Sequence, residues 1–204
     1  MIRRPIWLAL LAAAATVIGA SVTVRADETP RMTPSRDVDI TYRVFSGDKP
    51  MTERVRWLAA EGIERIDPHG KGYLLARSAY MIIDHNGKTA NIVDPKTRTV
   101  TVTVNPVAGE LAEIEKAKLT PLGRATVAKL TCQIWQAEIS PQVEREVCLT
   151  EDGVLLRLRN GDKTLLEATF VKYHHISSKL FETPPDYKPA SNAQAVPGAS
   201  YGGP

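Results

Sequence analysis

The stretch Thr99-Val-Thr-Val-Thr-Val104 decides the fold class, because valine and threonine alternate through all six positions. Period-two alternation of β-branched residues is typical of a strand with one buried and one solvated face. Strands that are wet on one side pair in antiparallel sheets. The alternation recurs at Val38–Val44 and Arg54–Trp57. We therefore predict a mainly β, antiparallel protein with one or two short helices.

Turn signals separate the alternating runs. Asn86-Gly87, Asp152-Gly153 and Asn160-Gly161 each lie between two such runs. These dipeptides favour positive φ at both central positions, so each predicts a two-residue type I′ hairpin. Divided at these turns, the chain is expected to form about eleven strands.

One segment, Gly109–Leu119, departs from the strand pattern. Leu111, Ile114 and Leu119 fall near one helical face, and a proline brackets the segment on each side. The pattern predicts a short helix. Such a helix either covers an open end of the sheet or fills a long surface connection.

The N-terminus has the composition of an export signal. Arg3 and Arg4 precede a nearly unbroken apolar run, and Ala26 supplies a small residue for cleavage. This pattern predicts a signal peptide over residues 1–26. The alternative is a transmembrane anchor, since the run approaches spanning length. With cleavage, we expect a periplasmic chain with no remaining transmembrane segment.

Both ends of the expected mature chain are poor in large apolar residues. Residues 27–36 and 188–204 are rich in proline and small or polar residues. Such segments bury too little surface to offset their ordering entropy, so a disordered linker and a disordered tail are predicted. The folded domain is then expected over residues 37–187.

Charge argues against two partner classes. Three of the 26 basic residues, Arg3, Arg4 and Arg25, lie in the first 26 positions, where there is no acidic residue. The remainder carries 23 basic and 23 acidic side chains. A chain without net charge has no general electrostatic attraction to nucleic acid or to an anionic bilayer.

Cys132 and Cys148 are the only cysteines of the chain. A hairpin centred on residue 140 pairs residues whose numbers sum to 280, as these two do. They would then be cross-strand neighbours, close enough to bridge in an oxidising compartment. We predict a structural disulfide between them.

No catalytic, cofactor or metal motif is recognisable. The sequence lacks GxSxG, HExxH, Walker A and GxGxxG patterns. His174 and His175 are adjacent and point to opposite faces of a strand, so they cannot chelate one ion. His85 precedes the predicted turn at Asn86 and is expected to be solvated. His69 lies in a Pro-His-Gly turn. We expect no enzyme and no cofactor.

The order of these parts resembles the LolA/LolB-like periplasmic lipoprotein carriers. The resemblance rests on an alternating first strand and on four further stretches: Arg54–Trp57, Tyr80–Asp84, Gly123–Cys132 and Phe181–Lys188. It implies an incompletely closed antiparallel half-barrel, covered by a helix, that holds a lipid or a lipoprotein acyl chain. The chain differs from LolA in its cysteine pair and its single clear helix, and from LolB in lacking a lipid anchor.

Under this resemblance, one concave sheet face would bind the acyl chain. Seven apolar residues at alternating positions are predicted to share that face: Tyr42, Val44, Trp57, Met81, Ile83, Val102 and Phe170. The alternative is a filled β-sandwich that acts as a structural or adaptor protein and binds another envelope protein.

Overall fold

The computed structural model describes residues 29–45, 49–69, 79–105, 113–114, 116–140 and 143–190. The predicted signal peptide, Leu111 and residues 191–204 of the predicted tail lie outside this part. Within it, no helix is both long and apolar enough to cross a membrane.

Strands dominate the described residues. Eleven of them match the predicted number, and a two-residue strand follows near the C-terminus. Their bounds are β1 Val38–Val44, β2 Met51–Leu58, β3 Ile63–His69, β4 Tyr80–Asp84, β5 Thr89–Asp94, β6 Thr99–Val104, β7 Lys118–Val127, β8 Leu130–Ser140, β9 Val143–Leu149, β10 Leu155–Asn160, β11 Lys163–Tyr173 and β12 Lys188–Pro189, with a 3₁₀ helix, η1, at Ser178–Phe181.

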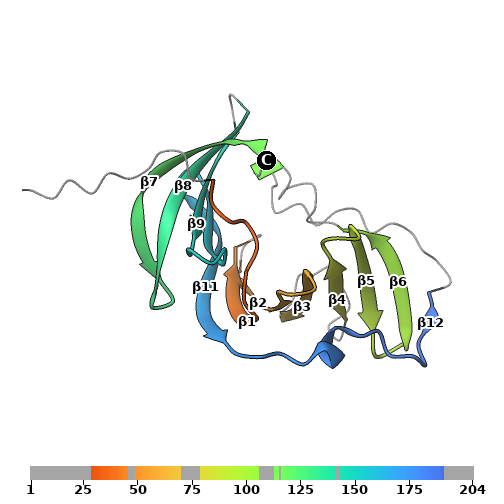
Figure 1. The fold of residues 1–204 in the computed structure, drawn as a ribbon. Coiled ribbons are helices and arrows are strands. Elements are labelled where there is room, and N and C mark those ends of the chain that lie inside the picture. Colours follow the sequence, from red (N-terminus) through yellow and green to blue (C-terminus); the bar gives the residue numbers. More distant parts are fainter. Residues whose placement is uncertain are drawn as a thin grey trace, which may run out of the picture.

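All twelve strands of the described residues belong to one open sheet. Its order is β12-β6-β5-β4-β3-β2-β1-β11-β10-β9-β8-β7, so β12 and β7 are the two edges. Neighbours are antiparallel except β12, which runs parallel to β6. In Figure 1, β7–β9 stand on one side and β4–β6 on the other, with β1–β3 between them. The purely antiparallel sheet that the sequence predicts is therefore wrong at one edge.

We call the sheet face that carries Val38, Ile40, Tyr42 and Val44 the inner face. These alternate residues of β1 are all buried, as the period-two pattern predicts. They belong to one apolar cluster that also holds residues of β2–β5 and of β7–β11. The main core is thus shared by the strands on either side of β1, β2–β5 and β7–β11.

The outer face of β2–β6 is covered by the segment that follows β11. Ile176 and Phe181 pack there against Leu58, Tyr80, Ile82 and Val93. Figure 1 shows this segment running below the sheet towards β12. The predicted disordered tail is wrong for its first residues, because Lys188 and Pro189 pair with β6.

Residues 29–36 are packed against the sheet, so the prediction of a disordered linker is wrong for them. The Ser35 N–H donates to the Asp152 carbonyl over 2.9 Å, and Pro34 is buried. Gly153 lies so close to this segment that an added Cβ would stand 2.2 Å from the Thr33 carbonyl oxygen. Glycine is required there, since any side chain would push the segment away.

The helix predicted over Gly109–Leu119 is shorter at its C-terminal end. Glu113, Ile114 and Lys116 are helical, but β7 already begins at Lys118, so Leu119 is a strand residue. Ile114 is buried in the main cluster. The rest of the predicted helix lies outside the described residues.

The predicted type I′ turns are wrong at all three dipeptides. Asn86 and Gly87 lack positive φ; Lys88 has it instead, at 54°. Asp84 Oδ1 accepts a 2.8 Å hydrogen bond from the Gly87 N–H, which stabilises a four-residue turn. At Asp152-Gly153 and Asn160-Gly161 only the glycine has positive φ.

A turn with positive φ at both central residues occurs where the sequence gives no signal. Ala128 and Lys129 have φ of 47° and 67° between the paired residues Val127 and Leu130. Neither residue type favours this region, because Cβ then crowds the carbonyl oxygen. The β7–β8 hairpin therefore carries backbone strain.

The predicted disulfide is present. Cys132 and Cys148 are joined, with Cα atoms 5.4 Å apart. The predicted register is wrong, because Cys148 pairs with Ile134 and not with Cys132. Ser140 pairs with Val143, so the numbers of paired residues sum to 283 there and to 282 from Glu138 onward, not to 280. The bridge is therefore diagonal, between residues two positions apart on one face.

Replacing Lys129 by glycine should stabilise the protein by about 1 kcal/mol, because glycine accepts positive φ without the Cβ clash. Urea unfolding measures the gain. Thr126→Gly, an exposed β7 position with ordinary φ, is the control and should destabilise. Equal losses in both variants would show that the turn is not strained.

Removing the disulfide with Cys132→Ala and Cys148→Ala should lower the free energy of unfolding by roughly 2–4 kcal/mol, since the cross-link limits the unfolded chain. The far-ultraviolet circular dichroism spectrum should stay that of a β protein. Reduction of the wild type should give the same midpoint as the double variant. A variant as stable as the oxidised wild type would contradict the expectation.

Candidate functional site

Five of the seven predicted ligand-binding residues share the inner face. Trp57 is opposite Glu64, and Glu64 is opposite Ile83. Met81 is opposite Ile66, two positions along the same strands. Together with Tyr42 and Val44 of β1, these residues form a continuous surface across β1–β4. Whether they bind a ligand stays a prediction.

Val102 lies on the opposite, outer face, so its predicted place beside Tyr42 is wrong. Thr101 pairs with Ile92, which pairs with the inner-face residue Met81. The threonines of β6 therefore belong to the inner face and the valines to the outer one. Val102 is 66% exposed. The alternation itself was predicted, but the choice of face depends on the four-residue turn between β5 and β6.

Phe170 also lies on the outer face, contrary to the prediction. It pairs with Thr41, whereas Tyr42 pairs with Ala168. A bulge at Thr169 reverses the side-chain alternation at this point of β11. Phe170 is 52% exposed. A single extra residue thus moves this phenylalanine from the expected face to the other.

The inner face is packed rather than open at four of the remaining residues. The exposed fractions are 0% for Ile83, 1% for Val44, 5% for Tyr42 and 8% for Trp57. Buried side chains at such values are in contact with other atoms on all sides. An acyl chain would have to displace this packing.

A polar cluster lies within the inner face beside Trp57. His85 Nε2 donates a hydrogen bond to Glu64 Oε2 over 2.8 Å, and both side chains are largely buried. The His85 ring stacks on Trp57 with ring centroids 4.6 Å apart. The prediction that His85 is solvated is therefore wrong. Glu64 interrupts an otherwise apolar row, and this is the sequence signal that could have indicated a buried partner.

Tyr42 adds a hydroxyl to the inner face. Its O–H donates to the Leu155 carbonyl over 2.7 Å and so links β1 to the start of β10. Burial raises the pKa of Tyr42 well above its ordinary value, and the negative charges of Glu64 and Glu53 add to the effect. The hydroxyl therefore stays protonated and serves as a hydrogen-bond donor.

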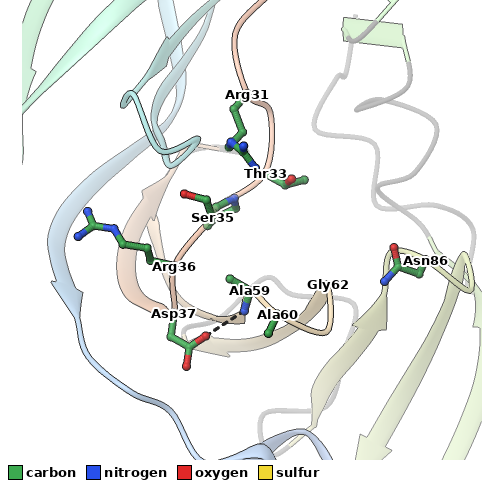
Figure 2. Close-up of a pocket in the computed structure, with 10 residues that line it drawn as sticks. Arg31, Thr33, Ser35, Arg36, Asp37, Ala59, Ala60, Gly62 and Asn86 are labelled. Atoms are coloured by element: carbon green, nitrogen blue, oxygen red, sulfur yellow. Dashed lines mark hydrogen bonds between the residues drawn. The ribbon is translucent and has the colours of Figure 1, made fainter.

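Two open cavities flank the N-terminal segment. One, of about 490 Å³, is lined by this segment and by the β2–β3 turn. Figure 2 shows Arg31, Thr33 and Ser35 across from Ala59 and Gly62, with Asn86 at one side. Asp37 Oδ1 accepts a hydrogen bond from the Ala59 N–H and fixes one wall. This lining is polar, unlike the apolar walls that surround a bound acyl chain.

The second cavity, of about 500 Å³, lies where the N-terminal segment meets β11 and the β9–β10 connection. Arg36 forms a 2.9 Å ion pair with Asp152 and lies over the Tyr173 ring. Burial would raise the pKa of Asp152, but hydrogen bonds from Thr150, Arg36 and Tyr173 outweigh it and lower that pKa. Asp152 is therefore ionised, and in this form it holds the N-terminal segment.

Replacing Asp152 by asparagine should reduce stability at pH 7, because the ion pair with Arg36 is lost. The carboxylate has a lowered pKa in the folded state, so its contribution is present above its ordinary pKa of 3.8 and is lost as the pH falls through the folded value. The loss of stability in Asp152→Asn, measured by urea unfolding, should therefore become smaller as the pH falls below 3.8 and through the folded pKa. Glu151→Gln is the exposed control. A deficit that is constant with pH would contradict this role.

Metal-binding clusters are absent from the described residues: no group of three His, Cys, Asp or Glu side chains could hold an ion.

Comparison with known proteins gives likenesses of structure alone. No family model and no curated protein matches the chain. An uncharacterised conserved protein from Thermus thermophilus aligns with a TM-score of 0.56 and 15% identity, over 76% of this chain and 90% of that one. The fold is shared.

MucB is a second similar structure. It aligns with a TM-score of 0.51 and 14% identity, over 76% of this chain and 60% of MucB. The complex structure of Pseudomonas aeruginosa MucA/MucB gives a TM-score of 0.50 and 13% identity, over 77% of this chain and 59% of that one. This chain thus spans about 60% of MucB. The likeness is consistent with the LolA-like fold expected from the sequence.

Proposed function

We propose that this chain is an exported, non-enzymatic binding protein of the cell envelope and that its partner is a polypeptide. Export rests on the sequence of residues 1–26. The open sheet is then the half-barrel of the LolA/LolB-like resemblance, filled by its own side chains. The adaptor function is thus favoured over the lipid carrier.

One observation carries this proposal: the inner face, where an acyl chain would lie, is occupied by packed side chains. Ile83 and Val44 are at most 1% exposed. Both belong to the same cluster as Val147 of β9 and Leu156 of β10. Sites that bury small apolar ligands are usually preformed apolar cavities. Recognition is therefore assigned to the surface.

The comparisons add support of a weaker kind. MucB and MucA of Pseudomonas aeruginosa were solved as a complex, so one protein of similar fold has a protein partner. The present chain spans about 59% of the aligned chain of that complex. We therefore infer a protein partner for this chain from its packed core. The MucA/MucB complex supports this inference by analogy.

Two charge substitutions separate a filled core from a lipid cavity. Ile83→Glu should unfold the domain, because a fully buried carboxylate without a partner costs several kcal/mol and domains are only marginally stable. Val102→Lys should melt like wild type, since that side chain is 66% exposed. Circular dichroism melts measure both.

The binding experiment uses the protein purified from its native envelope. Native mass spectrometry followed by organic extraction should find a polypeptide and no stoichiometric lipid, and a fluorescent fatty acid should show no saturable uptake. Saturable uptake by wild type, together with a folded Ile83→Glu variant that has lost it, would overturn the proposal in favour of a lipid carrier.

A further inference from the structure

The edge of β6 is paired for part of its length. The Lys188 N–H donates to the Arg98 carbonyl over 3.0 Å, and the Ala190 N–H donates to the Val100 carbonyl over 2.9 Å. Among the described residues, no strand continues beside β6 past Val100. The stretch from Thr101 to Val104 is therefore an edge without a neighbouring strand in that part of the chain.

The main-chain groups of Val102 and Val104 point to this edge. Along a strand, successive residues direct their N–H and C=O groups to alternate sides. The Val100 carbonyl faces β12, whereas the Asn105 N–H donates to Lys88 at the start of β5. Even-numbered residues therefore face the edge and odd-numbered ones face β5. Two N–H and two C=O groups are available there.

The side chains of the same two residues are the most exposed large apolar groups in the described part of the chain. Val102 is 66% exposed and Val104 is 75% exposed. Both lie on the outer face beside the free main-chain groups. A partner strand would thus meet hydrogen-bonding groups and apolar surface together.

The opposite edge of the sheet is protected in the ways that natural edge strands usually are. β7 contains Pro121, a register irregularity between Pro121 and Gly123, and the charged residues Lys118 and Arg124. Prolines, bulges and charges prevent pairing with other chains. β6 has none of these in Thr99–Val104. The difference marks β6 as the edge that accepts a strand.

We propose that the β6 edge at Thr101–Val104 binds an extended segment of a protein partner by strand addition. This inference rests on the proposed function and names the site of that function. The partner segment supplies main-chain groups to Val102 and Val104 and places uncharged β-branched or apolar side chains beside theirs.

Charge at the two ends of the stretch defines the partner further. Lys188 lies at the Thr99 end and Lys88 at the Val104 end. Both are exposed, and neither forms a salt bridge with a described residue. The partner segment therefore carries acidic residues on both sides of its apolar centre.

A second copy of this chain is a poorer occupant. Because β12 blocks one end, only four residues are available for edge-to-edge pairing. The lysines at the ends of this stretch would also face one another between copies.

The test uses a labelled probe peptide, Glu-Glu-Thr-Val-Thr-Val-Thr-Glu-Glu, and the full exported chain. Fluorescence anisotropy should show saturable binding that Val102→Pro weakens at least about tenfold, or 1.4 kcal/mol. Proline removes the edge-facing N–H of Val102 but none that bonds β5. Val102→Thr keeps this N–H and is the matched control, with binding within about twofold of wild type.

Two further probes need no change in the protein. The same peptide N-methylated at both valines should bind at least about tenfold more weakly, since it cannot form the ladder. A peptide with lysines in place of the glutamates should also bind more weakly, because of Lys88 and Lys188. Equal binding of the N-methylated peptide, or of Val102→Pro and wild type, would overturn the proposal.

Other occupants give distinct results. If the probe binds only after residues 191–204 are removed, the chain's own C-terminus occupies the edge and the proposal is wrong. Concentration-dependent dimers that Val102→Pro abolishes would identify a second copy instead. If the polypeptide isolated from the envelope stays bound to Val102→Pro, the edge is refuted while the proposed function stands.

Discussion

Strand β1 is the structural constraint on which the rest of the fold depends. It pairs with β2 on one side and with β11 on the other, and it is the connection in the described sheet between β2–β6 and β7–β11. Its inner-face residues Val38, Ile40 and Val44 are at most 1% exposed. Packing over this strand makes two groups of strands into one core.

The same packing restricts where function can be. A sheet whose inner face is filled by its own side chains has recognition surfaces on its edges, its outer face and its terminal segments. The segment after β11 covers part of the outer face, through Ile176 and Phe181. Residues 29–36 pack against the β9–β10 connection and are held there by Asp152. What remains accessible includes the β6 edge.

The sequence alone was sufficient for the elements that depend on local patterns. Alternation at Val38–Val44 and Thr99–Val104 predicted both strands, and burial alternates from Ile40 to Val44 in β1. The cysteine pair predicted the disulfide. These features depend on residue type and spacing along one strand or one hairpin, so they can be inferred without knowing the sheet.

The face assignments failed where they depended on several turns at once. Val102 alternates as predicted along its own strand, but the turn after β5 decides which face it occupies. In β11 the bulge at Thr169 breaks the alternation itself and puts Phe170 on the outer face. One residue more or less in a connection reverses every side chain beyond it. The burial of His85 likewise required knowing that Glu64 lies on the adjacent strand.

The central claim is that packing over β1 unites the two groups of strands into one cooperative core. Native-state hydrogen exchange measures this directly, because it gives an opening free energy for each amide. Amides of β1, β4 and β9 should exchange with the same free energy, equal to that of global unfolding. If the amides of β4 open at a clearly lower free energy while those of β9 stay protected, the two groups fold separately and the account is contradicted.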